Sequence, residues 1–233
     1  VHLGILAVPV TIIWIVGITN AVNLIDGLDG LAVGVSSIAA ITMLAVALLT
    51  GNMPIAITMA ALAGACIGFM PHNLNPATIF MGDTGSTFLG YMLATVSIMG
   101  LFKFYAVISF AVPFLILGLP IFDTANAIIR RLAEGRSPMS PDRGHVHHKL
   151  IDMGFNQKQA VAILYAISAT LGLTAVVLTS SGEVKAVVLL AAVLAAILVG
   201  ACIIYGAEHW GKHPQEQKKH KNEAAQEEKN KHE

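Results

Sequence analysis

Long runs of apolar residues dominate this sequence, and they restrict the chain to a helical membrane fold. Of its 233 residues, 55% are hydrophobic and 12% are charged, whereas a soluble domain has about 25% charged residues. A run of about 18 or more apolar residues is long enough to cross a bilayer as a helix. The sequence therefore predicts an all-α, polytopic transmembrane bundle over residues 1–206, with about seven spans. The predicted spans are 1–19, 31–50, 54–71, 86–101, 104–122, 159–179 and 184–205.

The two ends of the chain differ from this apolar part. Residues 207–233 are mostly Lys, Glu, Gln and His, so they cannot bury enough apolar surface to fold alone, and we expect a disordered cytoplasmic tail. The chain begins at Val1 without a methionine, and its first run lacks the basic flank of a signal peptide. We expect the chain to be a fragment whose upstream spans are missing.

Seven crossings would divide the loops into two sets on opposite sides of the membrane. The loops at 20–30, 72–85 and 123–158 share one side with the tail and contain most of the Lys and Arg residues. The other set contains only Lys103 and Lys185. Because positively charged loops remain in the cytoplasm, the first set is predicted to be cytoplasmic.

The first loop places polar side chains between two apolar runs. Asn20, Asn23, Asp26 and Asp29 follow one another at intervals of three. An aspartate near lipid costs about 2.5 to 3.5 kcal/mol, so such residues normally face a cavity, a partner or water. Glycine follows each aspartate and favours a turn over a continued helix. We predict that this loop binds a ligand; the alternative is that Asp29 caps the next helix.

In the second loop, Asp83 lies between Gly82 and Gly85. A helix beginning near Thr84 or Ser86 would direct free N–H groups at a phosphate. A carboxylate beside a phosphate requires a cation between them, and Mg²⁺ commonly joins carboxylates to substrate phosphates. The sequence predicts Asp83 as a Mg²⁺ ligand, with a helix cap as the alternative.

The third loop carries Arg143, His145, His147 and His148, which can donate several hydrogen bonds to an anion. His145 and His148 would share one face of a helix, whereas the adjacent His147 and His148 would not. Binding of a phosphate or nucleotide is favoured over a solvated basic loop. A zinc site is less expected, because no cysteine is nearby.

Other charged residues flank residues 145–148, which form the histidine segment. Asp123 lies where an apolar run ends, and it could orient a donor, help to hold the metal or be an ordinary interfacial residue. Arg130 and Arg131 are expected to anchor the chain at the membrane edge. Cys66 and Cys202 lie inside apolar runs, so neither a disulfide framework nor a thiolate metal site is expected. The formal net charge of zero gives no indication of a nucleic-acid partner, and none is expected.

Three ordered motifs resemble the polyprenyl-phosphate N-acetylhexosamine-1-phosphate transferases, glycosyltransferase family 4, which are membrane enzymes of bacterial cell-envelope synthesis. The motifs are Asn-x-x-Asp-Gly-x-Asp-Gly-Leu-Ala at 23–32, Phe-Met-Gly-Asp-x-Gly-Ser at 80–86 and His-x-His-His at 145–148. The resemblance covers about residues 1–205. Pro-Ile-Phe-Asp-Thr at 120–124 and the Pro-Asp-Arg-Gly before the histidines are similar to the branch that uses UDP-GlcNAc.

The resemblance implies transfer of GlcNAc-1-phosphate from UDP-GlcNAc to undecaprenyl phosphate at the bacterial plasma membrane, with release of UMP. The reaction would need Mg²⁺, or Mn²⁺ in its place, and would initiate an envelope polymer such as teichoic acid or O-antigen. The implied catalytic residues are Asp26, Asp29 and Asp83. The implied metal ligands are Asp83 and Asp26, although the sequence leaves open which of Asp26 and Asp29 touches the metal. The implied substrate-binding residues are Asn20, Asn23, Arg143, His145, His147 and His148.

Several alternatives to an active transferase remain open. The family's paired aspartates on an earlier cytoplasmic loop have no counterpart in this sequence, so one alternative is a non-catalytic remnant of the transferase. A second is a secondary transporter with ionisable residues at its helix ends, although a transporter would place them at the bilayer midplane and show a repeated half. A homodimer is a candidate assembly for the transferase.

Overall fold

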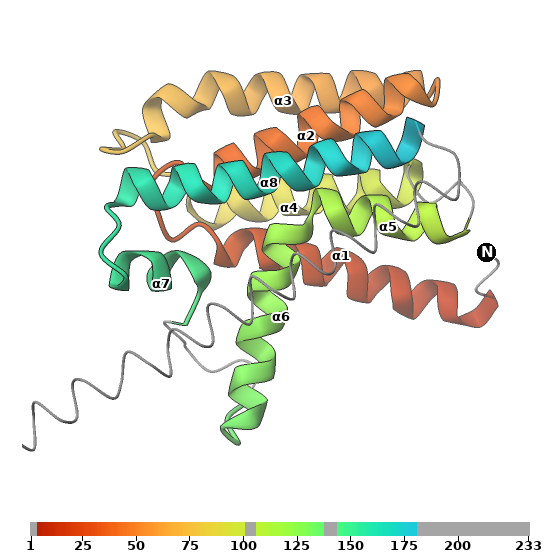
Figure 1. Ribbon diagram of the computed structural model, residues 1–233. Coiled ribbons are helices and arrows are strands. Elements are labelled where there is room, and N and C mark those ends of the chain that lie inside the picture. Colours follow the sequence, from red (N-terminus) through yellow and green to blue (C-terminus); the bar gives the residue numbers. More distant parts are fainter. Residues whose placement is uncertain (1–3, 101–105, 138–143, 181–233) are drawn as a thin grey trace, which may run out of the picture. The chain divides into compact units, whose positions relative to one another are not determined.

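The computed structural model describes residues 4–100, 106–137 and 144–180, and this part of the chain is helical without any strand (Figure 1). It confirms the predicted all-α class. The elements are η1 (Gly4–Leu6), α1 (Ala7–Leu24), α2 (Leu31–Leu49), α3 (Met53–Asn73), α4 (Gly82–Gly100), α5 (Ala106–Ile116), α6 (Gly118–Ala133), α7 (Val146–Asp152) and α8 (Gln157–Ser180). The predicted span at 184–205 and the predicted tail lie outside the described residues.

Four helical segments of the described part are long and apolar enough to cross a membrane, which makes the chain a multi-pass membrane protein. They are Gly4–Leu24, Leu31–Leu49, Met53–Asn73 and Gln157–Ser180, and they correspond to the first, second, third and sixth predicted runs. The fourth run forms α4, which has 19 residues and carries Asp83 in its first turn. Seven spans are thus not confirmed, although most of the predicted helices are present.

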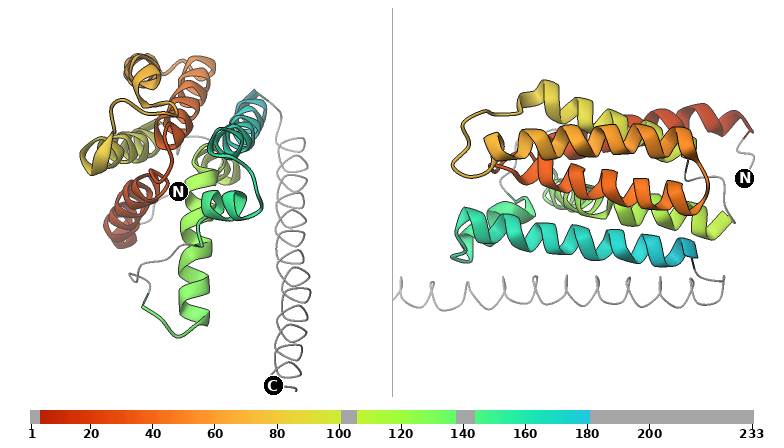
Figure 2. Two further views of the ribbon diagram at one scale, coloured as in Figure 1. Left: turned by 90° about the vertical axis from the view of Figure 1, so that its left-hand side faces the viewer. Right: turned by 90° about the horizontal axis from the view of Figure 1, so that it is seen from above.

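The single span predicted at 104–122 is wrong, because the structure divides this stretch between α5 and α6. α6 runs across the direction of the long helices (Figures 1 and 2). Pro120 lies in the first turn of α6, so in a continuous helix it could not bond to the carbonyl of Ile116 and its ring would clash there. Proline is tolerated in the first turn of a new helix, which is where the structure places it.

α2 forms the centre of the described bundle and packs against α3, α8 and α4, while α1 packs against α4 and α6. Buried small residues of α2, such as Ala39, Ala40 and Ala47, allow its neighbours to approach closely. The ring of Tyr165 on α8 lies directly against Gly34 of α2. The exposed side chains Ile12, Ile13 and Val16 of α1 are apolar, as expected for a lipid-facing surface.

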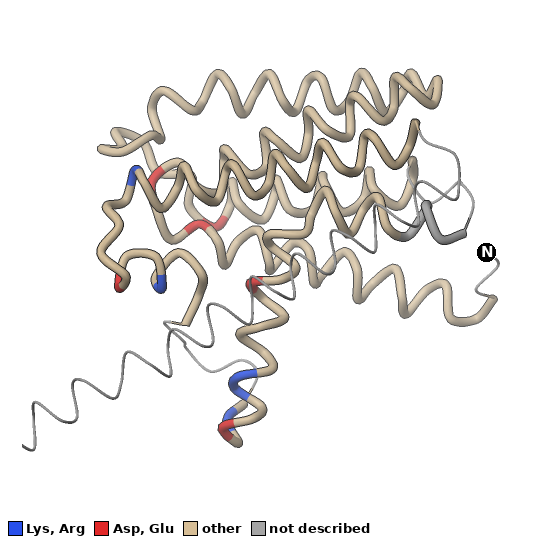
Figure 3. The backbone as a smooth tube through the Cα atoms, viewed as in Figure 1, with Lys and Arg blue, Asp and Glu red and all other residues tan. Residues whose placement is uncertain are grey.

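The segment 25–30, the segment 74–81 and α7 gather at one end of the long helices, whereas the connection between α2 and α3 lies at the other end (Figure 1). Charged residues of the described part lie at the first end and along α6, and the long helices between the ends carry none (Figure 3). The first two polar loops and α7, which belongs to the third, thus lie at the same end of the bundle, as expected for loops on one side (Figure 1). Their cytoplasmic location remains a prediction.

Candidate functional site

The last turn of α1 is joined to the first turn of α4 through Asn23. Its Nδ2 atom donates hydrogen bonds to Oδ1 of Asp83 at 3.1 Å and to Oγ of Ser86 at 2.8 Å. The buried Ser86 hydroxyl donates in turn to the carbonyl of Gly82 at 3.0 Å. Gly82 has φ of +64°, a backbone conformation that favours glycine. Two of the predicted motifs therefore meet at Asn23 and Asp83.

Asp26 lies just after α1 and is half-buried beside this contact. Burial, followed by the nearby charge of Asp83, raises its pKa from 3.8 to about 6. Two neighbouring carboxylates can supply oxygen ligands to a hard cation such as Mg²⁺. Within the described ranges, no group of three or more His, Cys, Asp or Glu could hold a metal ion. The carboxylate oxygens of Asp26 and Asp83 are of the kind that Mg²⁺ prefers, and a cation held there would need further ligands from substrate or water.

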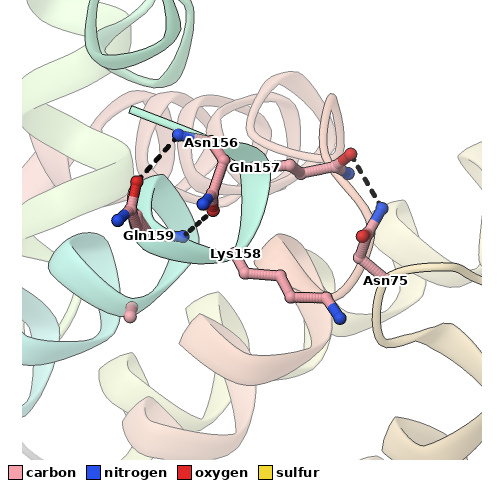
Figure 4. Close-up of a pocket in the computed structure, with 6 residues that line it drawn as sticks. Asn75, Asn156, Gln157, Lys158 and Gln159 are labelled. Atoms are coloured by element: carbon pink, nitrogen blue, oxygen red, sulfur yellow. Dashed lines mark hydrogen bonds between the residues drawn. The ribbon is translucent and has the colours of Figure 1, made fainter. Parts of the chain in front are cut away.

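Asp29 faces a different set of partners. Its Oδ2 atom accepts hydrogen bonds from Nδ2 of Asn75 at 3.0 Å and from the amide of Ala77 at 3.1 Å. Nδ2 of Asn75 also donates to Oε1 of Gln157 at 2.9 Å, so the first loop, the second loop and the start of α8 are joined (Figure 4). The N-cap of α2 is Gly30, which has no side-chain capping bond, so the capping role considered for Asp29 is wrong.

A hollow of about 430 Å³ borders this contact at the start of α8. Asn156 and Gln159 exchange hydrogen bonds between their amides and side chains there, at 3.0 and 2.9 Å, and so cap the helix (Figure 4). The lining consists of Asn75, Asn156, Gln157, Lys158, Gln159 and Ala162. The hollow therefore lies beside the Asp29 contact, and neither Asp26 nor Asp83 lines it.

The histidine segment is held by α6. Oδ2 of the buried Asp123 lies 2.9 Å from Nδ1 of His145, and Oδ1 of Asp123 accepts the amide of Val146 at 2.8 Å. Arg130 donates through Nη1 to the carbonyl of Gly144 at 3.0 Å. Of the roles considered for Asp123, orientation of a donor is the one that these contacts favour.

The relation between the histidine rings differs from the sequence-based expectation. His145 and His147 are stacked, with ring centroids 5.7 Å apart and planes at 7°, whereas helical spacing paired His145 with His148. The reason is that α7 begins only at Val146 and His145 has extended backbone as its N-cap. His148 is tilted against His147, with ring centroids 4.2 Å apart.

His147 connects the histidine segment to the first loop. It is 2% exposed, and a Cβ atom added to Gly27 would lie 2.7 Å from its Nε2 atom. That Nε2 atom has no hydrogen-bond partner in the described part of the chain. Burial, followed by the charge of His148, lowers the pKa of His147 to about 4. A neutral imidazole therefore separates the two loops at neutral pH.

Asn20, Arg130, Arg131 and Arg143 are the remaining residues for which the sequence predicts a role. Asn20 is exposed on α1, and its Nδ2 atom donates to the carbonyl of Val16 in its own helix at 2.8 Å. Arg143 lies outside the described residues. Arg131 is 6% exposed, and Arg130 donates to the carbonyl of Gly144. Anchoring at the membrane edge stays a prediction for both. The roles predicted for Asn20 and Arg143 stay predictions.

Sequence reasoning did not identify the residues that tie the loops together. Oδ1 of Asn73 accepts the amide of Gly30 at 3.2 Å, and the hydroxyl of Tyr165 donates to the carbonyl of Gly30. Asn75 and Gln157 complete the connection. Asparagines near a proline are typical of a turn, but no local pattern indicates that a tyrosine and a glutamine of a distant helix reach it.

Comparison with known proteins agrees with these motifs. Residues 1–101 match the model of the family described as Glycosyl transferase family 4. The chain is 45% identical over 180 residues to the probable undecaprenyl-phosphate N-acetylglucosaminyl 1-phosphate transferase of Bacillus subtilis, covering 77% of the chain and 50% of the relative. It is 40% identical over 181 residues to the decaprenyl-phosphate N-acetylglucosaminephosphotransferase of Mycolicibacterium smegmatis, covering 68% and 44%.

The name of a third relative indicates a different branch of the family, which transfers another sugar phosphate. The phospho-N-acetylmuramoyl-pentapeptide-transferase of Clostridium beijerinckii is 35% identical over 175 residues, which cover 73% of the chain and 50% of the relative. The chain thus spans about half the length of the curated relatives that it matches. Together with the three motifs at one end of the bundle, these matches show that the chain belongs to glycosyl transferase family 4.

Proposed function

We propose that this chain is part of a Mg²⁺-dependent phosphoglycosyl transferase that moves GlcNAc-1-phosphate from UDP-GlcNAc to undecaprenyl phosphate. The names of the Bacillus and Mycolicibacterium relatives support the N-acetylglucosamine branch, because their identities of 45% and 40% exceed the 35% of the pentapeptide-transferase. The product would initiate an envelope polymer such as teichoic acid or O-antigen. The polar loops would face the cytoplasm of a bacterial cell, where nucleotide sugars are available.

The observation that carries this proposal is the approach of Asp26 and Asp83 at one end of the bundle. Asn23 donates to Asp83 at 3.1 Å and thereby fixes one carboxylate, while the charge of Asp83 contributes to the raised pKa of Asp26. Neighbouring carboxylates of this kind would be costly without a cation. When bound between them, Mg²⁺ would neutralise charge on the diphosphate and on the departing UMP.

The transfer needs one bond to form and one to break. An oxygen of the lipid phosphate attacks the phosphorus that carries the sugar, and the bond from that phosphorus to the bridging oxygen breaks. The bridging oxygen and its electron pair leave with UMP. Because both substrates are anionic, the protein contributes mainly by positioning them and by offsetting their charge.

Different residues of the chain would bind the metal, orient its ligands and position the loops. Asp26 and Asp83 hold the metal, and Asn23 orients Asp83. Asp29, through its bonds to Asn75 and Ala77, fixes the first loop relative to the second. His147 of the histidine segment lies against Gly27, and from there the segment would contact the nucleotide or its diphosphate.

The test uses the protein in its native membranes, with radiolabelled UDP-GlcNAc and added undecaprenyl phosphate. We expect label to enter extractable lipid only with Mg²⁺ or Mn²⁺. We expect Asp83→Asn to lower the rate by about 100-fold or more, because the lost carboxylate would hold the cation that offsets the phosphate charge. Asp152→Asn is the matched control, since Asp152 is exposed at the end of α7. Undiminished transfer by Asp83→Asn would remove Asp83 from the metal site. Absence of Mg²⁺-dependent transfer by the unaltered protein would contradict the proposed function itself.

A further inference from the structure

We propose that Asp123 is a positioning residue for His145: it keeps the imidazole proton on Nδ1 and leaves Nε2 as the ring nitrogen that meets the anionic substrate. The inference rests on the proposed function for the nature of that substrate. The contact between the two side chains is independent of it. The interaction joins α6 to the segment that precedes α7, across 22 positions of sequence.

Both side chains are nearly inaccessible to water, and a hydrogen bond between buried groups is stronger than one exposed to water. Asp123 is 3% exposed and His145 is 6% exposed. Nδ1 of His145 lies 2.9 Å from Oδ2 of Asp123, a normal distance for a strong hydrogen bond. A buried carboxylate is costly unless its oxygens are paired, and here both are paired.

The direction of the hydrogen bond follows from the donor inventory. Oδ1 of Asp123 already accepts the amide of Val146 at 2.8 Å, and an ionised carboxylate can only accept. Nδ1 of His145 must therefore be the donor and carry the proton. Only Nε2 then remains for another partner, because the state of one ring nitrogen is set by the bond that the other makes.

α6 holds the backbone on both sides of this histidine as well. Asp123 and Arg130 are seven residues apart, which is about two helical turns, so they lie on similar sides of α6. Arg130 binds the carbonyl of Gly144 at 3.0 Å while Asp123 binds the amide of Val146 at 2.8 Å. Three consecutive residues, 144–146, are thus fixed from one helix.

The other ionisable groups around His145 do not replace this support. His147 stacks on the ring with centroids 5.7 Å apart, and its own pKa, lowered to about 4, makes it neutral at pH 7. His148 lies against His147, and Arg130 is bound to Gly144. Asp123 is therefore the side chain whose hydrogen bond orients the His145 ring. Since both of its oxygens are occupied by protein donors, it is not arranged as a metal ligand.

The experiment is a double-mutant cycle on the protein in its native membranes. Asp123→Asn keeps the size of the side chain and an acceptor for Val146, but it presents an NH₂ group to Nδ1. We expect kcat/KM for UDP-GlcNAc to fall by about 10- to 100-fold, as is typical when the partner that orients a functional histidine is lost. In a His145→Ala background, the same change should reduce kcat/KM by no more than about 3-fold, because the group it acts through is gone.

A second variant keeps the inference testable if Asp123→Asn does not fold. His145→Asn retains a donor near the Nδ1 position and lacks the distal nitrogen. We expect its melting temperature in detergent to match that of the unaltered protein while kcat/KM falls to the level of His145→Ala. Glu134→Gln is the matched control, because Glu134 is an exposed acid at the end of α6 that pairs with Arg136, and it should change neither quantity.

The outcomes separate this inference from the proposed function. Multiplicative losses from Asp123→Asn and His145→Ala would show that Asp123 acts independently of His145 and would overturn the inference. Full kcat/KM in His145→Asn would also overturn it, because Nε2 would then be dispensable. Either result would leave Mg²⁺-dependent transfer by the unaltered protein, and hence the proposed function, intact.

Discussion

Nε2 of His147 lies against the backbone of Gly27, so closely that a methyl group at position 27 would come within 2.7 Å of it. This contact places the histidine segment beside the loop that carries Asp26 and Asp29. It requires glycine for its lack of a side chain, and no positive φ is involved. The distance between the third loop and the first therefore depends on two residues that are 120 positions apart.

We expect Gly27→Ala to separate these loops. Because the ring of His147 is buried, the added methyl group should displace it, at a cost of about 1 to 3 kcal/mol of stability, as overpacking typically does. The substitution should also lower transferase activity. Gly64→Ala on α3 is the control, because nothing lies within 4 Å of the added Cβ. Melting temperatures in detergent provide the measurement.

A second substitution tests whether His147 is the cause. His147→Ser removes the ring, so Gly27→Ala should cost little further stability in that background. If the losses of stability from the two substitutions are additive, the loss in Gly27→Ala arises from a contact other than that with His147.

The stability of the protein should depend on pH through His147. Burial lowers its pKa to about 4 in the folded protein from 6.5, so between these values the unfolded chain binds more protons than the folded one. Stability is therefore complete above about pH 6.5 and declines as the pH falls towards 4, by about 2 to 3 kcal/mol in total. The melting temperature measured from pH 7.5 to 4.5 should show this decline. The slope should be smaller in His147→Gln and unchanged in His72→Gln, because His72 is exposed at the end of α3.

Asp29 and Asn75 should be coupled energetically. Their side chains share a hydrogen bond of 3.0 Å between the first and second loops. We expect Asp29→Ala and Asn75→Ala each to cost about 1 to 2 kcal/mol, and the double variant to cost less than the sum. Asn52→Ala is a control at the opposite end of the bundle, since its side chain makes no capping bond. Strict additivity of the two losses would mean that the bond contributes nothing to stability.

Tyr165 should contribute both a hydrogen bond and a packing surface to the first loop. Tyr165→Phe removes only the bond to the carbonyl of Gly30 and should cost about 1 kcal/mol. Gly34→Ala would force a methyl group into the tyrosine ring and should cost about 1 to 3 kcal/mol. Gly68→Ala, which meets nothing within 4 Å, should not destabilise the helix. Equal melting temperatures for Gly34→Ala and Gly68→Ala would contradict the packing argument.

Local sequence signals predicted the helices well but failed where a helix changes direction. The apolar runs at 31–50, 54–71 and 159–179 match α2, α3 and α8 closely, because hydropathy and helix length are properties of a continuous segment. The run at 104–122 is equally apolar, yet it is divided at Leu117. Pro113 and Pro120 permit the break, but proline alone does not determine it, since Pro71 lies inside α3 without ending it.

The sequence predicted the motifs of the candidate site but not the hydrogen bonds that join them. The motifs around Asp26, Asp83 and His145 were correctly expected at one end of the bundle. The sequence could not distinguish Asp26 from Asp29, which have the same glycine neighbour and similar surroundings in the chain. The structure separates them: Asp26 lies beside Asp83, and Asp29 is bound by Asn75 and Ala77.

The sequence by itself determined the helical membrane class, the three polar loops and the family, because these follow from hydropathy and from motifs within short segments. Only the tertiary structure decided which polar side chains meet. The bond from Asn23 to Asp83 spans 60 positions, that from Asn75 to Asp29 spans 46, and that from Tyr165 to Gly30 spans 135. Such pairs depend on how several helices pack at once, which leaves no pattern in any one segment.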